Sequence, residues 1–200
     1  MWTWILSTAL GGSSELTSRD EYLAAVSRMV VVVGQMSTAT YTFHKQEWVG
    51  EAQQPRQVMQ VKYRRSGDLY LKYVGKVHPG REVLYRPGPL PGEILVNPSA
   101  LLPTMTFELD GRIARSGERY TIEKLSLHRT AERYRADIQR LEALDFVGFD
   151  VTDLGPRLVS GEQAHCWLTV LPKKEDPDLY AQQVETCLSD RTQVVVSMKA

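Results

Sequence analysis

The chain of 200 residues lacks an excess of either charge, because 24 lysines and arginines balance 24 aspartates and glutamates. Proteins that bind nucleic acid usually carry a clear basic excess, so this balance argues against that class. The sequence also lacks an apolar run long enough to span a bilayer, which takes about 20 residues. Residues 1–14, MWTWILSTALGGSS, are typical either of a signal-peptide remnant or of a disordered tail. The first alternative predicts an exported protein and the second a cytoplasmic one.

Catalytic motifs are missing as well. The four histidines form no HExxH or similar metal-binding pair, and no cysteine lies at ligand spacing to one. No serine stands in a G-x-S-x-G elbow, and no glycine run precedes a helix as in a phosphate-binding loop. We therefore expect no catalytic residue, no metal and no cofactor. An unrecognised enzyme is a third hypothesis, which needs a cleft with convergent titratable groups such as Asp150, Asp153 and His165.

Only two cysteines are present, Cys166 and Cys187. They fall in two predicted strands, Ala164–Leu171 and Ala181–Leu188, on either side of the polar loop PKKEDPD. In an antiparallel hairpin centred inside this loop, the two residues face each other across the ladder. A disulfide and a pair of free buried thiols are both compatible with this pairing. A disulfide would indicate an oxidising compartment.

Two segments have the periodicity of helices. Ser18–Glu21 has the S-x-x-E pattern of a capping box, and apolar residues then recur at helical spacing as far as Val33. Thr121–Leu144 predicts a longer helix with one apolar face. Its other face carries opposite charges three and four residues apart, which is typical of a helix that faces solvent.

The rest of the chain alternates apolar and polar residues between turn signals, which indicates antiparallel strands. Gly148 and the pair Gly155–Pro156 are interpreted as breaks between the second helix and the last three strands. We predict an α+β fold for residues 15–200 as a single domain, with one curved antiparallel sheet and both helices on its concave face. The predicted strands are Thr38–Trp48, Arg56–Arg64, Leu69–Tyr73, Arg81–Arg86, Glu93–Val96, Thr104–Asp110, Gln163–Leu171, Ala181–Leu188 and Thr192–Lys199.

The block Lys62–Gly88, KYRRSGDLYLKYVGKVHPGREVLYRPG, resembles a block in an uncharacterised domain family of bacterial envelope proteins. The runs Tyr70–Tyr73 and Gly80–Tyr85 carry the likeness, and Asn97–Ser99 follows at the expected place. That family is similar to the LolA/LolB-type lipoprotein carriers. Their plan is an incomplete, half-open β-barrel with helices along its open side, around an apolar cavity. The family pattern continues for another strand or two after the point at which this chain ends.

The resemblance implies a periplasmic or envelope protein that binds an acyl chain, a lipid or a lipidated protein without catalysis. The basic segment 55–86, with eight lysines and arginines against two acidic residues, is either a solvated face or a rim for anionic groups. Arg64, Arg65 and Lys72 are the candidates for this rim. The candidate apolar wall of the cavity consists of Tyr41, Phe43, Met59, Val61, Tyr63, Leu71, Tyr73 and Leu84.

The same residues are compatible with a second class of function. If helix side chains fill the concavity, the wall is simply core, and the tyrosine hydroxyls lie at its edge. The protein would then be a structural or interaction module with no ligand. Its contacts would run through the basic segment or through the sheet edge at Thr192–Lys199. The sequence does not specify an oligomeric state.

Overall fold

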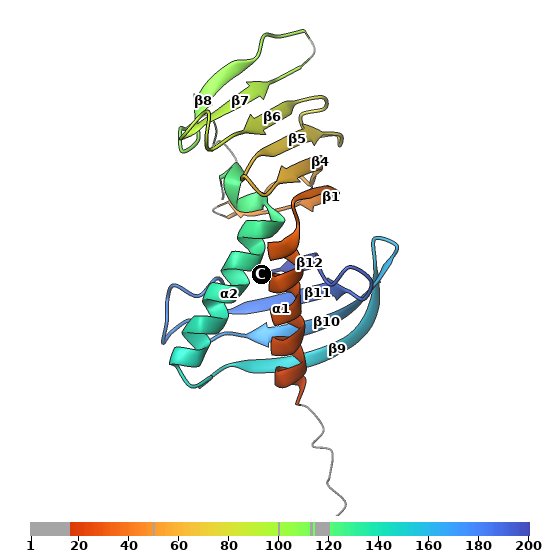
Figure 1. Cartoon of the computed structure of the whole chain (residues 1–200), viewed down its shortest axis with the longest axis vertical. Coiled ribbons are helices and arrows are strands. Elements are labelled where there is room, and N and C mark those ends of the chain that lie inside the picture. Colours follow the sequence, from red (N-terminus) through yellow and green to blue (C-terminus); the bar gives the residue numbers. More distant parts are fainter. Residues whose placement is uncertain (1–16, 50, 100, 113, 115–120) are drawn as a thin grey trace, which may run out of the picture.

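The computed structural model describes residues 17–49, 51–99, 101–112, 114 and 121–200. The expectation for residues 1–14 therefore lies outside the described residues. Figure 1 shows the arrangement of the elements. In chain order they are α1 (Ser18–Gln35), β1 (Thr38–Lys45), β2 (Trp48–Val49), β3 (Ala52–Gln53), β4 (Gln57–Arg64), β5 (Leu69–Tyr73), β6 (Glu82–Tyr85), β7 (Glu93–Asn97), β8 (Met105–Glu108), the 3₁₀-helix η1 (Ile122–Leu125), α2 (Leu127–Ala143), β9 (Asp150–Val159), β10 (Glu162–Val170), β11 (Gln183–Ser189) and β12 (Val195–Lys199).

The α+β class and the antiparallel strands are confirmed, and the described strands are divided between two larger sheets and a two-stranded pair, β2-β3, rather than joined in one sheet. A six-stranded sheet has the order β1-β4-β5-β6-β7-β8, and a four-stranded sheet has the order β12-β11-β10-β9. In both, strands that follow each other pair through short connections, as in a meander. The described strands do not close into a barrel, which agrees with the half-open plan that the resemblance implied.

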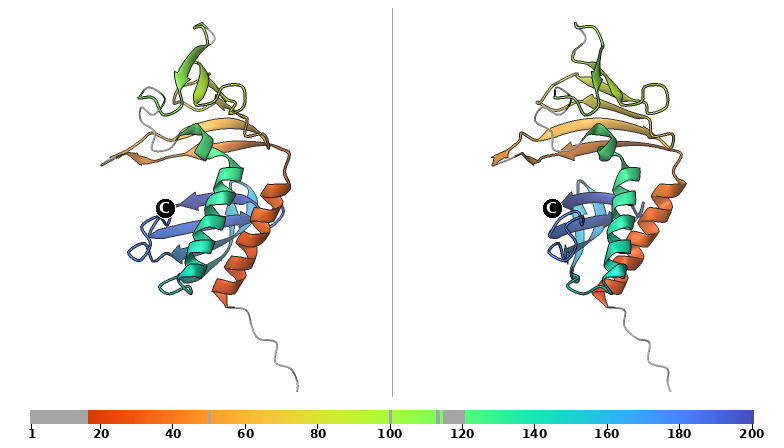
Figure 2. Two further views of the ribbon diagram at one scale, coloured as in Figure 1. Left: turned by 60° about the vertical axis from the view of Figure 1, so that its left-hand side comes forward. Right: turned by 90° about the vertical axis from the view of Figure 1, so that its left-hand side faces the viewer.

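The two helices lie side by side on one face of the four-stranded sheet (Figures 1 and 2). The end of α1 and the start of α2 point toward the six-stranded sheet, and η1 lies against that sheet (Figure 2). The segment from η1 to α2 therefore connects the two layers. This position brings the start of α2 next to the loops of the six-stranded sheet.

Helix α1 begins one residue earlier than the predicted capping box. Thr17 is the N-cap, and its side chain accepts a hydrogen bond from the Asp20 N–H at 3.2 Å, while the Asp20 side chain accepts one from the Thr17 N–H. The box is thus T-x-x-D at 17–20 and not S-x-x-E at 18–21, because the shorter aspartate reaches back equally well. The hydrogen bonds from Thr17 lower the pKa of Asp20.

The predicted helix at 121–144 is divided at Ser126. This residue has an extended backbone, with φ −77° and ψ 148°, and its hydroxyl accepts a hydrogen bond from the Arg129 N–H at 3.1 Å. A serine with this geometry is an N-cap. The predicted helix is therefore two helices, η1 and α2. The first turn of α2 faces the six-stranded sheet (Figure 2).

Strand β9 was not predicted, because Gly155 and Pro156 were interpreted as a break. Gly155 has φ +74°, which only glycine adopts readily, and it sits in a β-bulge that leaves Leu154 without a partner on β10. Pro156 pairs with His165 on β10. Since β9 is an edge strand, the proline removes no hydrogen bond inside the sheet.

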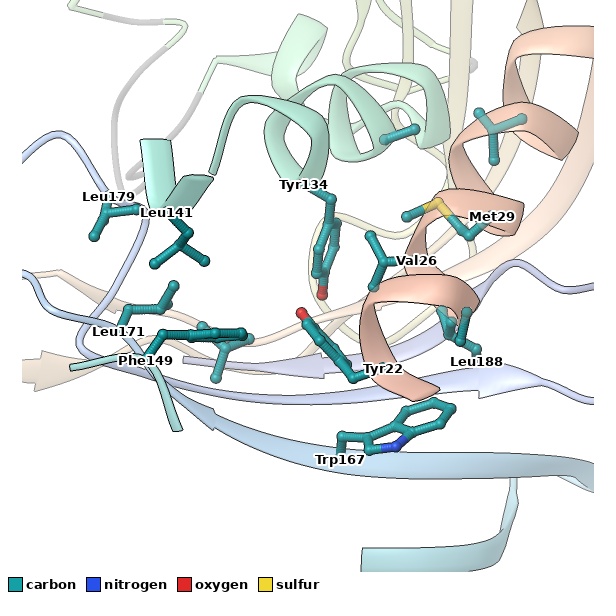
Figure 3. Packing of buried hydrophobic residues seen from close by; sticks show 14 residues of the cluster. Tyr22, Val26, Met29, Tyr134, Leu141, Phe149, Trp167, Leu171, Leu179 and Leu188 are labelled. Atoms are coloured by element: carbon teal, nitrogen blue, oxygen red, sulfur yellow. The ribbon is translucent and has the colours of Figure 1, made fainter. Parts of the chain in front are cut away.

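One hydrophobic core joins the helices to the four-stranded sheet (Figure 3). Tyr22, Val26, Met29 and Val33 supply one face of α1, at the helical spacing predicted from the sequence. Near the centre, the hydroxyls of Tyr22 and Tyr134 point toward each other (Figure 3). The Tyr134 hydroxyl is 2.7 Å from the Thr186 hydroxyl on β11, so the buried oxygens have partners. Burial raises the pKa of both tyrosines well above the ordinary value.

The two cysteines face each other in the β10–β11 ladder, at the register that the hairpin predicted. Their sulfur atoms are joined in a disulfide, and both residues are buried on the face of the sheet away from the helices. Leu154, Val159 and Val196 pack around them as a small separate cluster.

We expect Val26→Ala to lower the free energy of unfolding by about 2 kcal/mol, because two methyl groups leave a fully packed site. Val31→Ala is the matched control, since Val26 is 0% exposed and Val31, on the same helix, is 57% exposed. The control should change stability by less than about 0.5 kcal/mol. Urea unfolding measures both. Equal losses in the two variants would contradict the described packing of α1.

Removing the disulfide should also lower stability. It closes a segment with a sequence separation of 21, for which the loss is about 3 kcal/mol. The double variant Cys166→Ala/Cys187→Ala tests this by chemical unfolding with and without a reductant. The reductant should destabilise the natural chain and leave the double variant unchanged. If it changes neither, the thiols are free in solution.

Candidate ligand-binding site

Seven of the eight predicted wall residues share one face of the six-stranded sheet. Met59, Val61 and Tyr63 of β4 lie opposite residues of β1 and β5 whose side chains point the same way. We call this face the apolar wall, and the structure adds Leu69, Val83, Tyr85 and Ile94 to it. The predicted residues on it are Tyr41, Phe43, Met59, Val61, Tyr63, Leu71 and Tyr73.

Leu84 does not lie on the apolar wall. It pairs with Tyr70 and with Leu95 on the opposite face, because its neighbours Val83 and Tyr85 take the wall positions of β6. The prediction chose the wrong set of alternating residues in this short strand. In β5, Leu69, Leu71 and Tyr73 are buried on the wall face, and Tyr70 faces away from it.

The apolar wall is covered rather than open. Met59 and Val61, at its centre, are 0% exposed. Ile122 of η1 packs against the wall, together with Ala114 and Leu109. The cover that the described residues provide is therefore thin, with a single 3₁₀ turn where the four-stranded sheet has two long helices.

A pocket of about 210 Å³ opens at one end of the apolar wall. Strands β4 and β6 run in the same direction, so both end at this edge of the sheet, and η1 and the start of α2 close the other side. Tyr63 and Tyr85 belong both to the wall and to the pocket. We call this space the mouth pocket. Its lining residues are Tyr63, Arg65, Ser66, Gly67, Tyr85, Pro87, Glu123, Ser126, His128, Arg129 and Glu132.

Three tyrosines hold η1 and the start of α2 at the edge of the wall. The Tyr41 hydroxyl donates to the carbonyl oxygen of Leu125 at 3.5 Å, and the Tyr85 hydroxyl donates to the Glu123 carboxylate at 3.3 Å. The Tyr63 ring stacks on His128, with 6.4 Å between the ring centres. Burial raises the pKa of Tyr41 to about 12, so its hydroxyl stays a donor.

The charged groups of the pocket differ in how they are paired. Arg129 contacts Glu132 at 2.7 Å, a contact that raises the pKa of the arginine, and His128 lies 3.1 Å from the same glutamate. Arg65 instead donates to two carbonyl oxygens at the end of α1, those of Gly34 at 3.0 Å and Met36 at 3.2 Å. The last turn of α1 contains no basic residue, so Arg65 supplies the positive charge that this helix end favours.

Of the three predicted rim residues, only Arg65 lines the mouth pocket. Arg64 and Lys72 project from the opposite face of the sheet, where Lys72 contacts Glu82 at 3.1 Å. Sequence reasoning missed the contribution of the second helix. The signal that could have found it is Ser126, an N-cap residue inside the predicted helix, which marks a helix start with Glu123, His128, Arg129 and Glu132 around it.

Two of the three residues named for a catalytic cluster are in contact, but away from the mouth pocket. The Asp153 Oδ1 atom is 2.6 Å from the His165 Nε2 atom and also accepts the Gly155 N–H at 2.7 Å. Asp150 lies at the start of the same strand, opposite Val170. The pair is about two-thirds buried beside the Trp167 ring and stabilises the bulge of β9.

In the described part of the chain, no group of three histidine, cysteine, aspartate or glutamate side chains is placed to hold a metal ion. The same residues include no helix that is long and apolar enough to cross a membrane.

Comparison with known proteins places the sequence in a family without assigning an activity. Residues 36–200 match the family model described as "Protein of unknown function (DUF1571)". The membership predicted from the block Lys62–Gly88 in an uncharacterised domain family is thereby confirmed. No curated protein matches the chain.

The solved structures that resemble this one have low sequence identity to it and low TM-scores. Lipoprotein LppX from Mycobacterium tuberculosis has 11% identity and a TM-score of 0.45, over 88% of this chain and 84% of that chain. A LolA superfamily protein from Nitrosomonas europaea has 7% identity and a TM-score of 0.33, over 90% and 70%. These likenesses carry no activity over to the present chain.

The Asp153 contacts predict a pH-dependent stability. The Gly155 N–H, and then His165, hold the pKa of Asp153 below its ordinary value of 3.8. The carboxylate therefore stabilises the fold above pH 3.8, and this stabilisation is lost as the pH falls through the lowered pKa. Asp153→Asn should cost at most about 1 kcal/mol at pH 7, since the group is partly screened by solvent, and less at pH 2.5.

Urea unfolding at the two pH values measures this difference. Asp150→Asn, an exposed carboxylate at the start of the same strand, is the control and should cost little at either pH. A loss for Asp153→Asn that is as large at pH 2.5 as at pH 7 would rule out a role for the ionised carboxylate.

Proposed function

We propose that this chain, which belongs to the DUF1571 family of proteins of unknown function, is a non-catalytic protein of the bacterial envelope that binds an amphiphile. The acyl chain would lie on the apolar wall and the polar end in the mouth pocket. One observation carries this proposal: Tyr63 and Tyr85 line both surfaces, so a polar pocket is continuous with an aromatic and aliphatic face.

Entry of an acyl chain onto the wall requires η1 to move aside. The described contacts to be given up are two hydrogen bonds, from Tyr41 and Tyr85, and the packing of Ile122. Their cost is about 1 kcal/mol for each hydrogen bond and about 2–3 kcal/mol for the isoleucine. About six methylene groups, at about 0.8 kcal/mol each, offset this loss. A lipid with a longer chain therefore binds with a net gain, whereas a short one does not.

The disulfide supports the envelope location. Disulfides persist in oxidising compartments such as the bacterial periplasm and are rare in the cytosol. The bond between Cys166 and Cys187 is buried between paired strands, so it is a structural part of the sheet. An exported protein is the simplest context for it.

A second candidate is a structural or interaction module with a filled concavity. The complete burial of Met59 and Val61 favours it, because these side chains already have protein partners. The two functions differ in one measurable respect, since only the first includes saturable binding of a lipid by the purified protein.

The variant Ile122→Ala distinguishes them. Trimming this side chain thins the cover of the wall, and we expect the affinity for a fluorescent fatty acid such as cis-parinaric acid to rise about fivefold to tenfold. Leu84→Ala is the control, since Leu84 lies on the opposite face and should leave the affinity unchanged. Titration of probe fluorescence gives both values.

Native mass spectrometry of the protein purified from its own envelope fraction complements the titration. If no lipid co-purifies, and neither the natural chain nor Ile122→Ala binds the probe saturably, the amphiphile function is wrong and the interaction module remains.

A further inference from the structure

The mouth pocket contains one cation, Arg65, and one anion, Glu123, that form no ion pair with each other in the described part of the chain. Glu123 lies near Arg129 and helps to raise the pKa of that arginine. Among the described residues, the Arg65 guanidinium donates to the carbonyl oxygens of Gly34 and Met36. The Glu123 carboxylate accepts from the hydroxyls of Tyr85 at 3.3 Å and Thr121 at 3.5 Å. Both side chains line the same space.

The remaining charged groups of the pocket satisfy one another. Glu132 contacts both Arg129 and His128, so these three side chains form a cluster on the first turns of α2. With Arg65 and Glu123 added, the lining of the pocket contains two arginines and two glutamates. A purely anionic ligand would meet two carboxylates there, and a purely cationic one would meet two guanidinium groups.

We propose that the mouth pocket binds a zwitterionic head group, one with an ammonium and a phosphate or carboxylate joined by a short linker. The ammonium would lie at Glu123, beside the rings of Tyr85 and Tyr63, whose faces attract cations. The anionic end would lie at Arg65, whose guanidinium also donates to the carbonyl end of α1, and near the positive end of α2, which lines the same pocket. This inference rests on the proposed function, because it names the polar end of the amphiphile.

The size of the pocket fits such a group. A volume of about 210 Å³ leaves room for a small polar head group. Phosphoethanolamine is a small zwitterionic group of this kind. The same chemistry has two sources, an ethanolamine phospholipid and a free zwitterion such as an amino acid.

The test uses the full chain and three water-soluble probes, a zwitterion and its two charged parts. Glycerophosphoethanolamine is the zwitterion, glycerol phosphate the anion and ethanolamine the cation. Calorimetric titration should give an affinity for the zwitterion about tenfold or more above that for either half. Equal binding of glycerol phosphate, or no binding of the zwitterion, overturns the proposal.

Two variants locate the binding. Arg65→Gln and Glu123→Gln should each weaken glycerophosphoethanolamine about tenfold to a hundredfold, the loss expected for one charged hydrogen bond. Arg64→Gln is the matched control, because Arg64 precedes Arg65 in the chain and projects from the opposite face. Since Arg65 also contacts α1, thermal unfolding must show that its variant is folded. Glu123→Gln, which keeps the shape of the side chain, decides the matter if it is not. An unchanged affinity in a folded Glu123→Gln variant overturns the assignment.

A second experiment with lipids distinguishes a phospholipid ligand from a free zwitterion. It also distinguishes failure of the head-group assignment from failure of the proposed function. Native mass spectrometry after incubation with vesicles of phosphatidylethanolamine or phosphatidylglycerol should show the former lipid bound in preference. Binding of the soluble zwitterion without either lipid supports the pocket, assigns it to a free zwitterion and removes the acyl-binding function. Binding of cis-parinaric acid without the zwitterion does the reverse, since the wall then functions and the head-group assignment fails.

Discussion

The contact between the Tyr134 and Thr186 hydroxyls fixes the position of α2, and the candidate site depends on that position. This hydrogen bond, 2.7 Å long and inside the core, joins the middle of the helix to the middle of β11. A buried hydroxyl without a partner is costly, so a slide of the helix along the sheet is opposed by the loss of the Tyr134 hydroxyl's partner. The start of α2 then has to project beyond the four-stranded sheet, where it meets the loops after β4 and β6. The mouth pocket forms where η1 and the start of α2 meet the edge of the six-stranded sheet.

The four-stranded sheet with its two helices and the six-stranded sheet are packed differently. The first provides most of the stability, and the second provides the proposed binding surface. The four-stranded sheet is covered by two helices with 17 and 18 residues, whose apolar faces fill the space above it. The six-stranded sheet has an apolar face of at least equal extent, covered among the described residues chiefly by short segments such as η1. Regions with few packed contacts open at lower free energy than the core of a domain. A face that can open while the four-stranded sheet and its two helices stay folded is suited to bind an apolar ligand reversibly.

Local patterns in the sequence predicted the elements well and their grouping only in part. The stripe from Tyr22 to Val33 and the alternation from Thr38 to Glu108 correspond to α1 and to most of the six-stranded sheet. The division between the six-stranded and the four-stranded sheet depends on which strands do not pair across the η1–α2 segment, and period alone does not encode this. Strand β9 was missed because its bulge contains a Gly-Pro pair, which in most sequences indicates a turn between strands. At the site, alternation places Arg65 on the face of Met59, Val61 and Tyr63 and Arg64 on the opposite face, whereas the prediction assigned both to the rim. Glu123 and Arg129 come from η1 and the start of α2, and only the fold brings these next to the end of β4.

The bulge of β9 has a further consequence for the behaviour of the protein in solution. β9 has 10 residues, more than any other described strand, and it lies at the outer edge of its sheet. A long, regular edge offers a row of free backbone groups on which a strand of another molecule can add, the first step of aggregation. Here Pro156 has no N–H to offer, and the kink at Gly155 bends the strand away from a flat template. The Gly-Pro pair thus keeps this edge of the four-stranded sheet from recruiting another chain.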